Sequence, residues 1–278
     1  MSRFEIRRGR RELTPDIADR YVDLIDNETG AKARVNLKGA NLEQLFLKFD
    51  GEKDPVSVVY SYADWEAFER GVSRLKSTDQ LDDTQALNAY LLGSEHATWA
   101  SGTVISPANR LLDGILLTMN PDGSIIDRLE FEPNHDSSHS LLHGYVMNGM
   151  FGITDKSESD SGASVTLRVP VGYNMPGYGE RVHAYITFSL KKDGLYEQIR
   201  IINEGGKPTP ISLSRHLSLR VGDIPLDNHY LSMHALGMLE TDDVNNPTGR
   251  YVPQQLFIPG QPLYLGNINL DGTFVMGD

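Results

Sequence analysis

Two of the eight histidines lie where the chain is predicted to turn or to end a strand, and their imidazoles suit proton transfer. His143 stands in SSHSLLHGYVMNG, residues 137–149, directly before Gly144, and His216 closes a strand-like run in SLSRHLSL. The first segment lacks helical periodicity and glycine permits a sharp turn, so we predict a strand end that runs into a loop. Because imidazole titrates near neutral pH, the pair could transfer a proton to an oxygen leaving group.

Two other interpretations of the histidines remain open. His135, His139 and His143 recur every four residues, a spacing that on a helix would place three metal ligands on one face. The proline and the short polar residues of 133–138 make a poor helix, so we expect no metal site. Either histidine could also be structural, His143 within a turn and His216 as a hydrogen-bonded polar group in the core.

A second group of candidates could bind a ligand that is rich in hydroxyl groups. Asn109 and Arg110, in SPANRLLDG, place an amide beside a planar guanidinium fork. Asp271, in NLDGTFVM, is an acid in a turn before a strand. Asn-Arg pairs and Asp-Gly turns are common in proteins, so these residues do not assign a ligand by themselves.

The composition excludes several classes of protein. The chain of 278 residues has a formal net charge of −12, a sequence pI of about 5.1 and no cysteine, which excludes thiolate chemistry and disfavours nucleic acid and anionic membranes as partners. The polar N-terminus lacks a signal-peptide core, and no apolar run is long enough to predict a spanning helix. We expect a soluble, cytoplasmic protein, with a solvated basic terminus formed by Arg7, Arg8, Arg10 and Arg11.

The hydrophobic pattern predicts an all-β protein. Alternating segments at 21–25 and 33–37, separated by a turn at 27–30, indicate a hairpin. Further short strands recur from residue 103 onward at spacings of roughly 8–12 residues, which favours a large antiparallel β-sandwich. Residues 63–95 predict one or two short inserted helices. The sequence shows no internal repeat, no low-complexity linker and no nucleotide-binding motif that would indicate a second domain. We therefore expect a single domain over 1–278.

The order of the motifs resembles that of the aldose 1-epimerase (galactose mutarotase) family. ANRLLDG, LLHG, NEGGKPTPISLSRH, NNPTGRYV and LDGTFVM follow one another between about residue 21 and the C-terminus. In the family an N-R pair is followed by an L-H-G motif with one active-site histidine and a T-P-x-x-L-T-x-H motif with the second. A P-T-G motif and a D-H-x-F-like motif come after them. Five motifs in the family's order are more specific than any one of them.

The resemblance implies a β-sandwich with a sugar cleft, and an isomerase of hexose metabolism that interconverts the α and β anomers of a free aldose without a cofactor. It implies that His216 acts as general acid on the ring oxygen and that His143 holds or polarises the sugar. Asn109, Arg110 and Asp271 would bind sugar hydroxyl groups. A glutamate of the family takes the proton from the anomeric hydroxyl.

Several departures from the family pattern keep an alternative open. In place of the family's L-H-G-G motif this chain has Leu142-His143-Gly144-Tyr145. The aromatic pair that follows the second histidine in the family is replaced by Leu217-Ser218-Leu219, and the family's D-H is replaced by Asp271-Gly272. No residue matches the family's catalytic glutamate, which lies on a later strand, and the last strands of the sandwich are expected to be missing. The alternative is a carbohydrate-binding sandwich without turnover, or an epimerase of a sugar phosphate.

Two further expectations follow from these departures. A sandwich with open strand edges must cover them, so we expect a homo-oligomer or weak activity. Arg215 and Arg220 raise the possibility of an anionic sugar, although a solvated or salt-bridged pair is the favoured interpretation.

Overall fold

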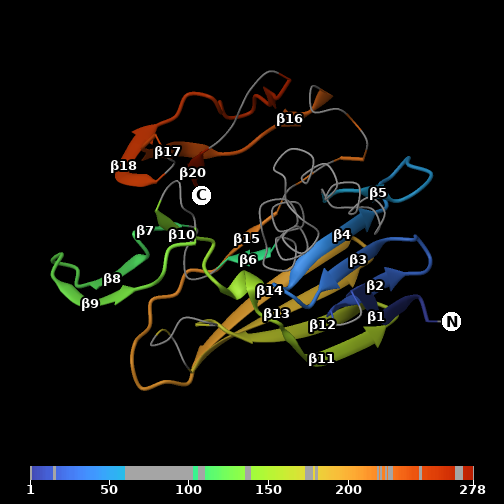
Figure 1. Ribbon diagram of the computed structural model, residues 1–278. Helices are drawn as coiled ribbons and strands as arrows, with labels where there is room; N and C mark the ends of the chain where they lie inside the picture. Colours follow the sequence, from blue (N-terminus) through green and yellow to red (C-terminus); the bar gives the residue numbers. More distant parts are fainter. Residues whose placement is uncertain are drawn as a thin grey trace. The chain divides into compact units, whose positions relative to one another are not determined.

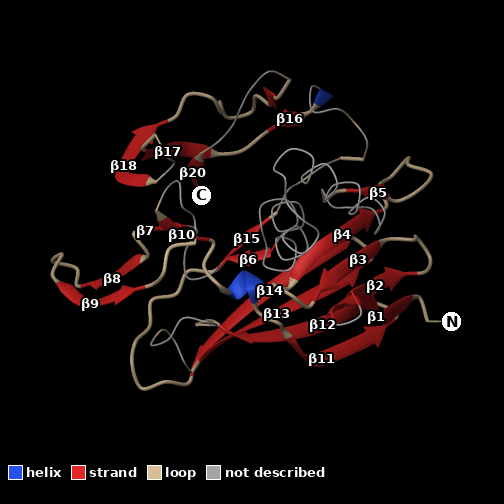
Figure 2. Ribbon diagram, in the orientation of Figure 1, coloured by secondary structure: helices blue, strands red, loops and turns tan. Residues whose placement is uncertain are grey.

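The computed structural model describes residues 2–14, 17–59, 103–105, 110–134, 139–172, 178, 181–217, 219, 221, 222, 224, 228–243, 246–266 and 272–277. The described part is almost entirely strand and loop, and its little helical structure includes the short 3-10 helix η2 (Val146–Asn148) (Figure 2). The predicted all-β class is therefore confirmed.

The helices expected at 63–95 fall outside the described residues. Within the described residues, no helix has the length and apolar character needed to cross a membrane.

Five antiparallel strands at the N-terminus form the first sheet (Figure 1). The hairpin predicted around residues 27–30 is confirmed, because Tyr21 to Ile25 pair with Asn36 to Lys32 across that turn. The basic N-terminal segment, for which only a solvated terminus was expected, forms the edge of this sheet. The strands in sheet order are β1 (Phe4–Thr14), β2 (Ile17–Asp26), β3 (Lys32–Asn36), β4 (Asn41–Leu47) and β5 (Val56–Ser57).

The second sheet is a meander of four antiparallel strands. It consists of β11 (Gly152–Ser159), β12 (Gly162–Pro170), β13 (Val182–Lys191) and β14 (Gly194–Asn203). Nine residues of β13 alternate strictly between buried and partly exposed, as the sequence pattern predicts for a strand with one face on the core. The turn at 191–194 gives the two-residue connection of a tight hairpin, because Lys191 pairs with Gly194.

The two sheets pack against each other and enclose an apolar core. Strands β1 and β2 contact β11, β12 and β13, and the side chains that face inward are fully or almost fully buried. These are Val22, Leu24, Ala33 and Val35 from the first sheet, and Leu167, Ile186, Phe188 and Leu190 from the second. Burial of each large apolar side chain contributes about 1.5–3 kcal/mol, so this layer holds the sandwich together.

The contacts divide the chain into two compact units, 1–109 with 116–129 and 143–222, and 110–115 with 130–142 and 223–278. The first unit holds both sheets, all but the end residues of the hairpin of β8 (Ile115–Met119) with β9 (Ile125–Glu130), and the pair of β6 (Thr103–Ile105) with β15 (Ser214–His216).

The second unit consists of smaller antiparallel pieces. β7 (Arg110–Leu112) pairs with β10 (Ser140–Leu142), and β16 (Tyr230–Leu231) pairs with β19 (Leu263–Tyr264). Three further strands form a sheet in the order β18 (Pro247–Pro253), β17 (Ala235–Thr241) and β20 (Thr273–Met276).

Candidate active site

His143 and His216 lie side by side in the first unit. Their ring centroids are 4.9 Å apart and the ring planes are inclined by 56°. The two residues are far apart in the sequence, so the fold alone brings them together. Two imidazoles at this separation can act on one small substrate, one as proton donor and the other as a hydrogen-bonding group.

The backbone at His143 is held in an unusual conformation. His143 has φ of 60° and Gly144 has φ of 65°, so two consecutive residues are left-handed. This region is unfavourable for a residue with a side chain and easily accessible to glycine. The His143 side chain is also buried, with 4% of its surface exposed. Strained backbone that positions a buried polar group is typical of functional sites.

The strand before His143 is fixed by an asparagine. The Nδ2 group of Asn134 donates to the carbonyl of Leu142 at 3.0 Å, and the backbone N–H of Leu142 donates to Oδ1 of Asn134 at 2.7 Å. The Asn134 side chain therefore acts like a neighbouring strand for Leu142, the residue directly before His143. The predicted strand end running into a loop is confirmed, because β10 ends at Leu142.

His216 occupies the last position of strand β15. This strand pairs with β6, so that His216 lies opposite Thr103. The side chain is partly buried, and burial lowers its pKa below the ordinary value, while a backbone hydrogen bond opposes that shift. The neutral imidazole is therefore favoured at neutral pH, and the protonated form is a stronger acid than an ordinary histidine.

Arg215, the residue before His216, is engaged in the first unit. Its guanidinium contacts Glu197 of β14 at 2.6 and 3.0 Å and donates to the carbonyl of Ala40 at 2.9 Å. It also lies over the ring of Phe188, 5.1 Å from its centroid. The salt-bridged interpretation of Arg215 is therefore confirmed, and Arg220 lies outside the described residues.

The other candidate residues have different outcomes. Arg110 lies in β7 of the second unit, where it pairs with Leu142. Asn109 and Asp271 fall outside the described residues, as does His135. His139 is exposed, with its Nε2 atom 3.9 Å from a carboxylate oxygen of Asp113. Because His139 and His143 both have positive φ, they do not share the face of a helix, which removes the geometry on which the metal interpretation depended.

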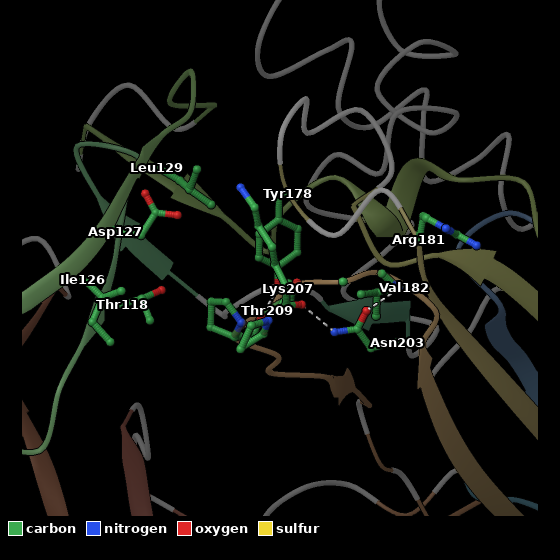
Figure 3. Close-up of a pocket in the computed structure, with 14 residues that line it drawn as sticks. Thr118, Ile126, Asp127, Leu129, Tyr178, Arg181, Val182, Asn203, Lys207 and Thr209 are labelled. Carbon is green, nitrogen blue, oxygen red and sulfur yellow. Dashed lines mark hydrogen bonds between the residues drawn. The ribbon is translucent and has the colours of Figure 1, made fainter.

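A cavity of about 760 Å³ lies at the loop that leads to β15 (Figure 3). Thr118, Ile126 and Asp127 of the β8–β9 hairpin form one wall, and Tyr178 and Lys207 stand on the other. Together the two walls therefore offer the hydroxyl of Thr118, the carboxylate of Asp127 and the ammonium group of Lys207 to a polar ligand. Neither histidine lines this cavity.

The loop beside this cavity is held by its own hydrogen bonds. Nδ2 of Asn203 donates to the carbonyl of Lys207 at 2.9 Å, and the N–H of Gly205 donates to Oδ1 of Asn203 at 2.8 Å (Figure 3). The Tyr178 hydroxyl donates to the carbonyl of Pro210, and burial raises the pKa of Tyr178 to about 12. Sequence reasoning missed Tyr178, because its partner lies 32 residues further along the chain.

Comparison with known proteins identifies the family of the chain. The family model described as aldose 1-epimerase matches residues 73–270, which is more than half of the 278 residues. No curated protein sequence matches. The resemblance found in the motifs is therefore confirmed by a match that extends over most of the chain.

Solved structures of the same fold share little sequence with this chain. A galactose mutarotase-like protein from Clostridium acetobutylicum is 15% identical with a TM-score of 0.69, over 99% of this chain and 73% of that one. Galactose 1-epimerase from Lactobacillus acidophilus is 17% identical with a TM-score of 0.68, over 98% and 74% of the two chains. A GalM/aldose epimerase homologue from C. elegans is 17% identical with a TM-score of 0.65, over 94% and 72%. At these identities the likeness establishes the fold, so the predicted sandwich is confirmed.

Proposed function

Because the chain belongs to the aldose 1-epimerase family, we propose that it interconverts the α and β anomers of a free aldose at the His143–His216 pair. The observation that carries this proposal is the 4.9 Å separation of the two imidazole rings, in the first unit, at the two histidines of the family's motifs. The left-handed backbone and the burial of His143 support it, because such features cost stability unless they position a side chain.

The reaction needs one proton donor and one proton acceptor. His216 gives a proton to the ring oxygen while a base removes the proton of the anomeric hydroxyl, so that the bond between C1 and the ring oxygen breaks and an aldehyde forms. Rotation about C1–C2 exposes the other face of the carbonyl. The ring hydroxyl then attacks C1 and returns its proton to His216, while the new anomeric oxygen takes a proton from the base.

The two histidines have different roles in this scheme. His216 lies at the end of a regularly paired strand and its pKa is lowered by burial, so its protonated form is a strong donor toward a weakly basic ring oxygen. His143, beside it, orients the ring and polarises it through a hydrogen bond. The base is the one role for which the family motifs of this chain offer no residue.

Polarimetry tests the proposal directly. Freshly dissolved α-glucose and α-galactose change optical rotation at a measurable uncatalysed rate, and the protein should increase that rate in proportion to its concentration. His216→Asn, checked for folding by circular dichroism, should abolish most of the increase. An increase that the His216→Asn and His143→Asn variants both retain would contradict the proposal.

A second candidate function is carbohydrate binding without turnover, and the cavity beside the loop of Asn203 favours it. That cavity offers the carboxylate of Asp127, the ammonium group of Lys207 and threonine hydroxyl groups without any histidine. If this function holds, a sugar titration should show binding that Lys207→Gln weakens and His216→Asn leaves unchanged, while optical rotation changes at the uncatalysed rate.

A further inference from the structure

The turn between β3 and β4, residues 37–40, contacts the segments that carry the two histidines. It connects Asn36 with Asn41, which pair with each other at the end of the hairpin. The turn and both histidines belong to the first unit. Two of its side chains are buried, Leu37 with 9% and Ala40 with 0% of the surface exposed. Most connecting segments lie on the surface, whereas this turn is part of the packed interior.

One side of the turn is hydrogen-bonded to the chain that follows His143. The N–H of Gly39 donates to the carbonyl of Gly149 at 2.9 Å, and the N–H of Phe151 donates to the carbonyl of Leu37 at 2.8 Å. These bonds flank an antiparallel bridge. Gly149 caps η2, which begins three residues after His143. The short ladder therefore fixes the segment after His143 against the turn.

The other side of the turn is hydrogen-bonded to the residue before His216. Nη1 of Arg215 donates to the carbonyl of Ala40 at 2.9 Å. The side chain of Arg215 is 10% exposed, and its other contacts, with Glu197 and with the ring of Phe188, hold it in place. The turn is therefore bonded to both histidine segments, to one through its first three residues and to the other through Ala40.

The backbone of the turn is strained where it makes these contacts. Gly39 has φ of 66° and Ala40 has φ of 45°, so two consecutive residues are left-handed. Glycine adopts this conformation readily and alanine does not, so Ala40 keeps it only because its surroundings determine it. The N–H of Leu37 donates to the carbonyl of Arg20 in β2 at 2.8 Å, which ties the turn to the first sheet.

We infer that this turn sets the separation of His143 and His216, and that Leu37 and Ala40 are positioning residues for the pair. In the described part of the chain, β10 and β15 belong to different two-stranded sheets, so strand pairing does not fix the distance between the rings. The turn is bonded to both segments and to the first sheet, and it supplies a common reference for them. The effect on catalysis rests on the proposed function, whereas the placement of the rings does not.

Leu37→Ala and Ala40→Gly loosen the turn in different ways, and Leu45→Ala is the matched control. Leu37 and Leu45 lie in the same hairpin with 9% and 8% of their surface exposed, so the two truncations should reduce stability similarly. Ala40→Gly keeps the carbonyl that accepts from Arg215 but gives the backbone access to other conformations. Thermal melting shows whether each variant is folded, and Ala40→Gly decides the test if Leu37→Ala does not fold.

Nuclear Overhauser effects between the imidazole protons of His143 and His216, in protein with labelled histidine, report the distance between the rings without any assay of activity. The effect should be present in the unchanged protein and in Leu45→Ala, and weak or absent in Leu37→Ala and Ala40→Gly. In polarimetric kinetics the latter two should lose kcat by roughly 10–10²-fold, because a displacement of about 1 Å at a catalytic group costs up to that much. Leu45→Ala should keep its kcat.

An Overhauser effect of equal strength in all four proteins would overturn the inference, and so would equal losses of kcat in Leu37→Ala and Leu45→Ala. Absence of the effect from the unchanged protein would also overturn it, because the rings would then not lie 4.9 Å apart. Loss of the effect in Leu37→Ala and Ala40→Gly alone, from a protein that does not catalyse mutarotation, would support the positioning of the rings and contradict the proposed function.

Discussion

Arg215 and Glu197 join the strand of the second histidine to the second sheet of the sandwich. The Nη2 and Nε atoms of Arg215 lie 2.6 and 3.0 Å from one carboxylate oxygen of Glu197. Because Arg215 also donates to the carbonyl of Ala40, its guanidinium connects three segments of the first unit directly beside His216. We interpret Arg215 as a positioning residue for His216.

Arg215→Met should therefore lower both stability and turnover. Removal of the guanidinium takes away the ion pair with the exposed Glu197 and the hydrogen bond to the carbonyl of Ala40, which together cost about 1 kcal/mol. Chemical denaturation of Arg215→Met, Glu197→Gln and the double variant forms a cycle in which the coupling energy should be favourable. A role of Arg215 in binding a sugar phosphate would instead appear as a raised KM for phosphorylated sugars alone, with stability unchanged.

His216→Asn should reduce kcat by about 10²–10⁴-fold, the usual contribution of general acid–base catalysis. Asparagine retains a hydrogen-bonding group but cannot give up a proton near neutral pH. His143→Asn should raise KM as well as lower kcat, because His143 is proposed to orient the sugar. Polarimetric kinetics on both variants separate these roles, and a change in stability alone for His143→Asn would show that this histidine is structural.

The pattern of the sequence was sufficient to predict the strands of the second sheet and the loop at His143. Strand β13 has one face on the core, so its alternation predicted it directly. The glycine after His143 predicted the turn, because glycine accepts the left-handed conformation that the chain adopts there.

Other features depend on tertiary contacts that local patterns do not carry. Strand β15 covers only Ser214–His216, which is shorter than the strand-like run that His216 was expected to close. The partner of Arg215 could not be predicted either, because Glu197 lies in another sheet. The residue types and the family resemblance made His143 and His216 a candidate pair, but no local pattern could place the two rings side by side.

A comparison of Gly144→Ala with Gly123→Ala should show whether the left-handed backbone after His143 is needed for activity and not only for stability. Both glycines have positive φ, 65° and 87°, so each substitution should cost about 1–2 kcal/mol. Gly123 lies in the turn between β8 and β9, where an added Cβ meets no atom within 4 Å, whereas Gly144 directly follows His143. Thermal melting should show similar losses for the two variants, and only Gly144→Ala should lose mutarotation. Equal loss of activity in both would mean that the position of His143 does not depend on this backbone.

The stability of the protein should fall as the pH is lowered from about 7.5 to 5.5, and His216 should contribute to that fall. Burial lowers the pKa of folded His216 below the 6.5 of an ordinary histidine, so the unfolded chain binds a proton more readily than the folded protein. The contribution of His216 is therefore fully present above pH 6.5 and is lost as the pH falls through the lower pKa of the folded state. His183, whose pKa is lowered by burial and by Arg168, acts in the same direction.

His216→Asn should consequently reduce the slope of unfolding free energy against pH in this window without removing it. Urea denaturation at a series of pH values measures that slope, and a variant whose slope equals that of the unchanged protein would show that His216 has the same pKa in both states.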